Sequence, residues 1–376
     1  MNFSLNDEQS MLKESVVQYI DKSYEFEDRM NVVESPEPYS AEKWQEFAEL
    51  GWLSLPFSTD DDGFGGGTVE LMLMMEELGR GLVIEPYLAA IVMAGGCIKR
   101  SDNAALRQRL LPLVMSGETV PALAYAERGS RYTLNHVETT AQADGDDFVI
   151  NGEKFVVFNG ATADQIVVVA RTSGAFADDT GITLFCVDAE SHGITRQGFT
   201  NVDGSHAAHI TFDNVRVTKD EAVSAIGEGL AMLESVVLEA TLAVCAEAIG
   251  IMDALTTKTV EYTKDRKQFG LPLSSFQALQ HRMVDMFMEL EQSRSLLLRA
   301  AIRLDEGDPQ APAAVAALKY YIGTAGRKLG EEAVQLHGGM GVTNELDVAH
   351  LFKRLTVIDT LFGNSDYQLN RYIDAM

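Results

Sequence analysis

The hydrophobic period of this chain changes twice, and that change constrains the fold more than any other feature. Residues 1 to about 120 carry apolar side chains at helical spacing, with Asn6 placed to cap the first helix ahead of acidic residues. From Leu123 the apolar residues form short runs rich in β-branched and aromatic side chains, separated by turn pairs such as Asp144-Gly145. From Gly227 the helical period returns. The order predicts a helical domain, a domain of strands and a second helical domain.

We expect these domains at residues 1–120, 121–222 and 223–376. The first should contain helices near Ala41–Leu50 and Val69–Leu78. Strands are expected at Val137–Ala143, Phe148–Ile150, Ile166–Arg171, Ile182–Val187, His209–Phe212 and Val215–Val217. Short strands without helical crossovers predict an antiparallel barrel or sandwich. The third domain should be a four-helix-bundle-like set of long helices over Ala231–Lys258, Thr259–Phe269, Ser274–Leu304, Ala311–Leu336 and Asp347–Ile373.

The stretch Tyr262–Gln280 predicts a tight corner between two of these helices. Its first part, to Phe269, is interpreted as a last helical turn that Gly270 stops. Ser274 is predicted to cap the next helix, with Gln277 completing a capping box. Gly270 and Ser274 therefore predict where one helix ends and the next begins.

Net charge excludes several classes of partner. The formal charge of −26 argues against nucleic acid and anionic membrane surfaces, because phosphate contacts need clustered Lys and Arg. Any site for an anionic cofactor must therefore be locally basic. Lys264, Arg266 and Lys267 form such a cluster at the predicted corner.

The remaining composition favours a cytoplasmic protein. No apolar run is expected to reach the ~20 residues that a membrane span needs, and the start of the chain lacks the pattern of a signal peptide. The cysteines Cys97, Cys186 and Cys245 are odd in number and lack metal-type spacing, so we expect neither disulfides nor a metal site.

Two segments of the C-terminal region carry a family resemblance. Tyr262 to Gly270 has the pattern Tyr-x-x-x-Arg-x-Gln-Phe-Gly, followed by Phe276-Gln277, and Glu332–Gly341 reads EAVQLHGGMG. With these segments the chain resembles the acyl-CoA dehydrogenases over nearly its whole length, and most nearly the small-subunit branch of the pimeloyl-CoA dehydrogenases. The resemblance implies FAD as cofactor, an acyl-CoA substrate that is dehydrogenated between Cα and Cβ, an electron-transfer flavoprotein as electron acceptor, and an oligomer.

The resemblance also implies which residues would contact FAD. An arginine at position 266 faces the cofactor pyrophosphate, where a guanidinium can fork onto two oxygens. Glycines at 338 and 339 let the backbone approach without a Cβ. The matching positions are Arg266, Phe269, Gln277, Gln335, Gly338 and Gly339. Alternatively, Arg266 pairs with an acid on the surface of the helical bundle.

The catalytic base is missing from its usual position. Most family members carry a glutamate near the C-terminus that removes the α-proton, and the matching residue here is Gly363. Other members carry the base on the first long C-terminal helix, where the family spacing leads to Ala240. Glu239 lies one residue away, Glu247 lies two turns further along, and Asp366 lies one turn beyond Gly363. These three are the candidate displaced bases.

The predicted β domain departs from the family as well. Its flavin-facing strand reads Ala126-Glu127-Arg128-Gly129-Ser130-Arg131, shorter than the family pattern and without its proline. At the position of a Thr or Ser that contacts the flavin ring, the chain has Phe158, which cannot donate a hydroxyl hydrogen bond.

The residues that match the family pattern and the residues that depart from it belong to different flavin sites of the assembly. In tetramers of the family, the matching residues belong to the surface lent to a neighbour's flavin, whereas the losses belong to a subunit's own flavin and acyl pocket. We therefore expect a heteromeric enzyme in which this chain completes the FAD site of a second acyl-CoA dehydrogenase-like subunit. The alternatives are a complete homomeric enzyme with a displaced base, a non-catalytic binding or assembly protein, and an acyl-CoA oxidase.

Overall fold

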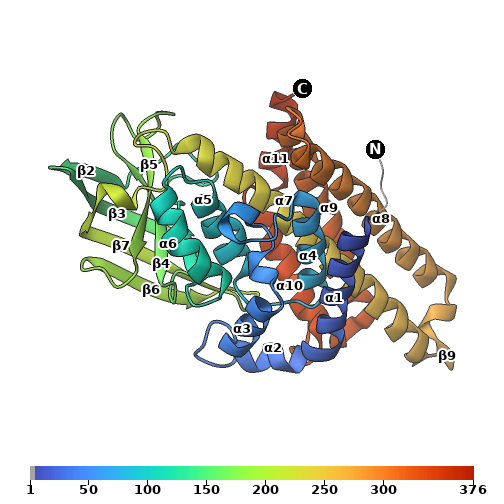
Figure 1. Ribbon diagram of the computed structural model, residues 1–376. Helices are drawn as coiled ribbons and strands as arrows, with labels where there is room; N and C mark the ends of the chain where they lie inside the picture. Colours follow the sequence, from blue (N-terminus) through green and yellow to red (C-terminus); the bar gives the residue numbers. More distant parts are fainter. Residues whose placement is uncertain (1–4) are drawn as a thin grey trace. The chain divides into compact units, whose positions relative to one another are not determined.

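The computed structural model describes residues 5–376, which form two compact units (Figure 1). The first unit comprises the N-terminal segment through Asn31, Gly67–Val83 and Thr241–Met376. The second comprises Val32–Gly66 and Ile84–Ala240. The boundary near residue 240 falls inside the long helix α7 (Leu230–Asp265).

The first unit is helical. Besides most of α7 it contains α1 (Asp7–Ser23), α4 (Thr68–Arg80), α8 (Gln277–Asp305), α9 (Ala311–His337), α10 (Asp347–Thr360) and α11 (Ser365–Asp374), with α2 (Phe26–Val33) crossing into the second unit. The predicted N-cap is confirmed, because the Asn6 side chain accepts from the Gln9 amide at 2.8 Å and the Gln9 side chain accepts from the Asn6 amide at 3.0 Å. Helix α4 covers the predicted Val69–Leu78.

Helix α9 is the centre of the C-terminal helices and contacts α8, α10 and α11. Its glycines permit close packing. A Cβ on Gly323 would lie 2.1 Å from an Asp359 carboxylate oxygen, and one on Gly330 would lie 2.6 Å from the Phe352 ring. These small residues let α10 and the start of α11 pack directly on the α9 backbone.

Helix α7 is long and apolar enough to cross a membrane by length and composition, contrary to the expected absence of such a run. Its most apolar window is 89% buried inside the protein. Residues such as Leu242, Val244 and Ile249 are fully buried. Burial of this kind is what a core helix shows.

The second unit contains helices and one sheet. Besides the start of α7, its helical elements include α3 (Ala41–Glu49), a π-helical segment (Leu88–Ala94), α5 (Gly95–Lys99) and α6 (Ala104–Met115). The sheet has strands β1 (Pro121–Ala124), β2 (Thr140–Asp144), β3 (Asp147–Phe158), β4 (Gln165–Arg171), β5 (Ile182–Asp188), β6 (Ile194–Thr200) and β7 (His206–Val217). The strand order is β1-β4-β2-β3-β7-β6, with β5 paired to β4.

The sheet confirms a β domain between helical segments, with differences in detail. The pairs β2–β3, β3–β7, β4–β5 and β6–β7 are antiparallel, whereas β1 and β2 each pair with β4 in parallel. The two predicted strands before residue 218 are one strand, β7. Strands β1 and β6 were not predicted, because PALA is short and ITRQGFT lacks apolar alternation.

Two predictions about the C-terminal helices were wrong. Helix α7 is continuous to Asp265, so the proposed helical turn reaching Phe269 does not exist. The chain instead forms a hairpin of β8 (Lys267–Gln268) and β9 (Leu271–Pro272). The predicted helix Asp347–Ile373 is also interrupted, between α10 and α11, at Leu361–Asn364.

The predicted cap of α8 was wrong as well. Ser274 lies in a short 3₁₀ turn (Leu273–Ser275), and α8 begins at Gln277 with Phe276 as its N-cap residue. The capping box with Gln277 is therefore absent.

Candidate functional site

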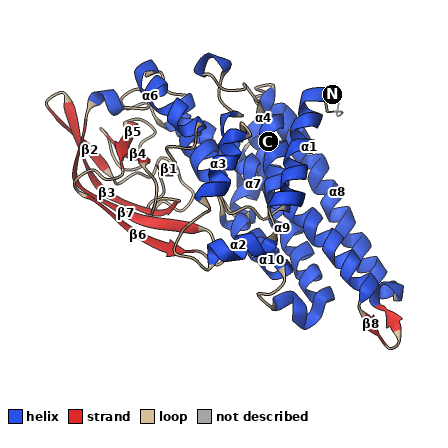
Figure 2. Cartoon of the chain, turned by 60° about the horizontal axis from the view of Figure 1, so that its bottom comes forward, coloured by secondary structure: helices blue, strands red, loops and turns tan. Residues whose placement is uncertain are grey.

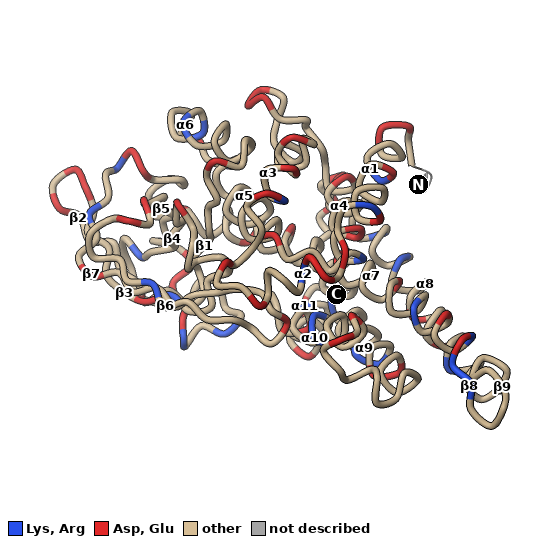
Figure 3. Tube along the Cα trace, turned by 90° about the horizontal axis from the view of Figure 1, so that it is seen from below, with Lys and Arg blue, Asp and Glu red and all other residues tan. Residues whose placement is uncertain are grey.

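The β8–β9 hairpin, which follows α7, contains the end of the first segment that carries the family resemblance. Phe269 and Gly270 form its two-residue turn with φ of +54° and +82°, as the tight turns of β-hairpins require. Phe269 is 93% exposed at the tip. Figure 2 shows the hairpin beyond the ends of the helices, and Figure 3 shows basic residues where the chain enters β8.

Arg266 is the cation at the base of the hairpin. Its amide donates to the Tyr262 carbonyl at 2.8 Å, and its own carbonyl accepts from the Leu273 amide at 2.8 Å. The backbone is thus fixed on both sides while the side chain is exposed. Within residues 5–376 the guanidinium forms no ion pair, so the alternative of an acid partner on the bundle surface finds no support.

The second segment forms a turn at the end of α9. His337 is the last helical residue, and Gly338 follows with φ of +62°, a conformation that favours glycine. A Cβ on Gly338 or Gly339 would meet nothing within 4 Å, so the backbone there is open. Gln335 is exposed beside it.

The structure brings the two segments together through one aromatic pair. The rings of Tyr262 and His337 stack with centroids 4.3 Å apart and an interplanar angle of 26°. We call the exposed residues on either side of this pair the hairpin–turn surface. It consists of Arg266, Phe269, Gln277, Gln335, Gly338 and Gly339. All belong to the helical unit, and none is buried.

Of the three candidate bases, Glu247 is held by an arginine. Its two carboxylate oxygens accept from Arg354 at 2.6 Å (Nε) and 2.9 Å (Nη2). Both side chains are nearly buried, with 9% and 13% exposed. One guanidinium thus engages both oxygens of this carboxylate, which fits a structural ion pair better than a free catalytic base.

Glu239 is held by two cations. Its oxygens accept from Lys99 Nζ at 3.1 Å and from Arg100 Nη2 at 2.6 Å. Burial raises the pKa of the Glu239 carboxyl, but Lys99 and Arg100 outweigh burial and hold that pKa below its usual range. The lowered pKa makes this group a weaker base still.

Gly363 lies in a turn that is built around glycine. Its φ is +107°, and the preceding Phe362 has φ of +55°. A Cβ on Gly363 would lie 2.3 Å from Tyr367 Cδ1 and 2.8 Å from Gln368 Nε2. The turn therefore has no room for the side chain that the family places at this position.

Buried polar side chains form hydrogen bonds to the same turn, and no sequence pattern indicated them. Lys319 is fully buried, and its Nζ donates to the carbonyls of Asp359 at 2.9 Å and Gly363 at 3.1 Å. The buried Gln368 donates from Nε2 to the Phe362 carbonyl at 2.6 Å. Asp366 is exposed in the first turn of α11, where an acid suits the helix N-terminus.

In the sheet unit, the segment that follows β1 contains Glu127, which forms a buried ion pair with Lys154. The Glu127 carboxylate accepts from Lys154 Nζ at 2.7 Å and from the amides of Glu138 at 2.6 Å and Thr139 at 3.0 Å. Lys154 is fully buried, and burial lowers its pKa to about 8, although Glu127 opposes that shift. Neither partner stood out in the sequence as part of a pair.

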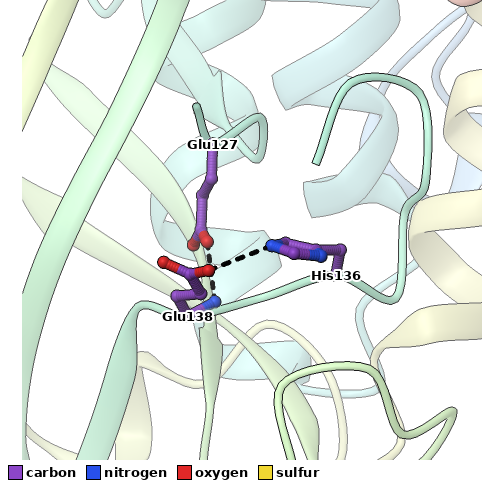
Figure 4. Close-up of side chains that lie close together, drawn as sticks. All are labelled: Glu127, His136 and Glu138. Atoms are coloured by element: carbon purple, nitrogen blue, oxygen red, sulfur yellow. Dashed lines mark hydrogen bonds and ion pairs between the residues drawn. The ribbon is translucent and has the colours of Figure 1, made fainter. Parts of the chain in front are cut away.

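Glu127 also lies beside His136 and Glu138, with potential ligand atoms within 4.8 Å of one another (Figure 4). The oxygens of Glu127 already accept three hydrogen bonds, one of them from an ammonium group. His136 Nε2 contacts Glu138 at 3.2 Å. The ammonium of Lys154 would repel a cation, so the group is a structural network rather than a metal site.

Phe158 ends β3 and is partly buried opposite Ala207 of β7. Just before it, Val156 has φ of +52° at an irregularity in the β3–β7 pairing. Nearby, Arg128 lies 4.5 Å above the Phe155 ring. His209 then bridges Phe155 and Phe199 at centroid distances of 4.7 and 4.8 Å. These side chains contact one another in a row, with the ring planes of His209 and its two phenylalanine neighbours tilted by 52° and 42°.

Comparisons with known proteins cover the whole chain. Models of the acyl-CoA dehydrogenase N-terminal, middle and C-terminal domains match residues 6–118, 122–215 and 227–376. The chain is 28% identical to the probable acyl-CoA dehydrogenase YngJ of Bacillus subtilis, over 98% of this chain and 97% of the relative. It is 25% identical to a short-chain specific acyl-CoA dehydrogenase of Clostridium acetobutylicum, over 98% and 97%.

Solved structures are similar along the full length. The ChsE4–ChsE5 complex from Mycobacterium tuberculosis matches with a TM-score of 0.90 and 25% identity, covering 100% of this chain and 98% of that chain. A variant of the Tcur3481–Tcur3483 steroid ACAD matches at 0.88 and 27%, covering 99% and 98%. The FAD complex of PigA has the same fold, with a TM-score of 0.93 at 24% identity, covering 100% and 98%.

Proposed function

This chain belongs to the acyl-CoA dehydrogenase family, and from that premise we propose that it completes the FAD site of a different, catalytically equipped subunit. Members of the family are FAD-dependent oxidoreductases that act on CH–CH bonds. The chemistry of the assembly would be α,β-dehydrogenation of an acyl-CoA, in which FAD supplies the hydride acceptor.

The observation that carries the proposal is the glycine turn at position 363. The α-proton can be removed only by a base that reaches it. Gly363 has no side chain, and a Cβ there would clash with the present positions of the Tyr367 and Gln368 side chains. Glu239 and Glu247 are bound in ion pairs. This chain therefore offers no suitable proton acceptor at either position that family members use.

The hairpin–turn surface, in contrast, fits an anionic dinucleotide. Arg266 is an exposed guanidinium with a fixed backbone and no ion pair within the described chain. Gly338 and Gly339 expose backbone without steric obstruction. A charged donor and open backbone, connected through the contact between Tyr262 and His337, are suitable groups for phosphate oxygens. Because the surface lies on the outside of the helical unit, we propose that it faces a cofactor carried by the neighbouring subunit.

The proposal also specifies the partner, the substrate, the electron acceptor and the location of the enzyme. The partner would be a second acyl-CoA dehydrogenase-like chain, as in the two-chain complexes named among the similar structures. The substrate would be a dicarboxylyl or bulky acyl-CoA, as for the pimeloyl-CoA and steroid side-chain enzymes. Electrons would pass to an electron-transfer flavoprotein, and the enzyme would work in the cytoplasm. The expected domains at 1–120, 121–222 and 223–376 remain part of the same proposal.

A test of the proposal begins with the chain expressed alone. We expect a colourless preparation that lacks the flavin absorbance band and does not turn over acyl-CoA thioesters. Co-expression with the acyl-CoA dehydrogenase-like chain of an adjacent gene should yield a complex that contains FAD and is active. Stoichiometric FAD and dehydrogenation by the chain alone would refute the proposal.

The rival that the structure favours most is a homomeric enzyme that uses Asp366. This carboxylate is exposed and lies one turn beyond Gly363. Substitution of Asp366 by Asn would then abolish flavin bleaching by acyl-CoA in the chain alone. Unchanged bleaching in Asp366→Asn, and likewise in Glu239→Gln and Glu247→Gln, would exclude the rival.

A further inference from the structure

Tyr262 and His337 form a contact to which the proposed function assigns no role. Their rings stack at 4.3 Å, and the Tyr262 hydroxyl donates to the His337 carbonyl at 3.3 Å. His337 is itself fixed, because its Nδ1 contacts the Ala333 carbonyl at 2.8 Å and must therefore carry the proton. Burial lowers the pKa of His337, which favours a neutral ring at neutral pH.

Each residue of the pair is directly connected to one half of the hairpin–turn surface. The Tyr262 carbonyl accepts from the Arg266 amide at 2.8 Å, so a backbone bond at the end of α7 connects Tyr262 to the base of the hairpin. His337 immediately precedes Gly338, and its carbonyl is the atom that the Tyr262 hydroxyl holds. The Tyr262 side chain therefore connects the last turn of α7, which leads into Arg266, to the start of the glycine turn through its ring stack and its hydroxyl bond.

We propose that Tyr262 and His337 are positioning residues that fix the spacing between the Arg266 guanidinium and the Gly338–Gly339 backbone, so that both can contact the phosphates of one FAD. The inference rests on the proposed function. Arg266 and the glycine turn belong to segments far apart in sequence, and a ligand that contacts both requires a defined distance between them. Displacements of about 1 Å at such sites cost substantial binding or rate.

The test is FAD affinity in the assembled enzyme that contains this chain. FAD is removed from the assembly and titrated back while flavin fluorescence is followed. We expect Tyr262→Ala to raise the Kd for FAD about tenfold, which corresponds to about 1.4 kcal/mol. Tyr262→Phe keeps the ring stack and should remain within about twofold of wild type, since a single hydrogen bond contributes modestly.

Two further variants keep the result interpretable. Tyr372→Ala removes a partly exposed tyrosine from α11, outside the hairpin–turn surface, and should leave the Kd unchanged. If Tyr262→Ala does not assemble, Tyr262→Leu retains apolar volume while it removes both the stack and the hydroxyl. Subunit composition is compared by size-exclusion chromatography, because a merely structural role would alter assembly or melting without changing the Kd of the assembled fraction.

The outcomes separate this inference from the function on which it rests. If Arg266→Gln weakens FAD binding while the assembled Tyr262→Ala or Tyr262→Leu variant retains a wild-type Kd, the positioning role is wrong and the proposed function stands. If none of these variants changes the Kd, including Arg266→Gln, both are wrong.

Discussion

Replacement of Gly363 by alanine tests whether the base position is closed by structure or merely lacks a carboxylate. A residue other than glycine in an unfavourable positive-φ conformation costs about 1–3 kcal/mol. The new Cβ would also lie 2.3 Å from Tyr367 Cδ1 and 2.8 Å from Gln368 Nε2, and overpacking of this kind costs about 1–3 kcal/mol. We therefore expect Gly363→Ala to lower the free energy of unfolding by about 2–6 kcal/mol.

The chain offers a matched control for the backbone contribution. Gly307 also has a positive φ, of +64°, but a Cβ there would meet nothing within 4 Å. Gly307→Ala should therefore cost only about 1–2 kcal/mol from its left-handed conformation. A second substitution, Tyr367→Ala, in the Gly363→Ala background should recover part of the loss, since it removes the closest clashing atom.

Urea-induced unfolding of the chain, followed by circular dichroism, measures these differences. Equal losses of unfolding free energy for Gly363→Ala and Gly307→Ala would contradict this prediction, because the turn at Gly363 would then have room for a side chain. A Gly363→Glu variant with wild-type stability would refute it more strongly. In that case the turn would accept a side chain at position 363, and a catalytic carboxylate could be restored there by one substitution.

The remaining predictions concern charge. Glu247→Gln should lower the free energy of unfolding by about 3 kcal/mol, because Arg354 loses its buried counter-charge, and it should leave the rate of flavin reduction in the assembled enzyme unchanged. Urea unfolding measures the first effect and stopped-flow absorbance the second. Slowed flavin reduction would contradict the prediction. Arg266→Gln should weaken FAD binding by about 1.5–3 kcal/mol, the range for hydrogen bonds to charged groups, and retained affinity would count against the cofactor role. Burial lowers the pKa of His337 in the folded chain, whereas the unfolded histidine has the ordinary pKa of about 6.5. The unfolded chain therefore binds more protons than the folded chain below about pH 6.5, and the free energy of unfolding should fall as the pH drops below that value. His337→Gln should remove up to about 1.4 kcal/mol per pH unit from that slope, and an unchanged slope would show that another group is responsible.

The fold was predictable because the hydrophobic period is a property of the sequence. The strands β4 and β5 and the helices α3, α4 and α9 lie within a few residues of the predicted ranges. The wrong helix predictions occurred where the local sequence is compatible with more than one way of ending a helix. Gly270 indicates the end of a helix as readily as it indicates a hairpin turn, and the Phe269–Gly270 pair adopted the hairpin.

The candidate site was predictable only in part, for a different physical reason. Motifs identified exposed residues such as Arg266, which short sequence patterns can describe. The contacts that close the base position come from distant elements: Lys319 lies on α9 and bonds to the carbonyl of Gly363, which lies between α10 and α11. Similarly, Lys154 of β3 neutralises Glu127 across the sheet unit. Tertiary contacts of this kind leave no pattern in a single sequence.

The most direct test of the central claim is an experimental structure of the FAD-loaded complex that contains this chain. In that complex we expect Arg266 of this chain to contact the phosphates of an FAD whose ring stacks on the partner subunit's sheet, with a carboxylate of the partner beside the substrate α-carbon. We also expect one FAD for each pair of unlike subunits. A flavin ring on this chain's own sheet, with a carboxylate of the same chain at the α-carbon, would contradict the account.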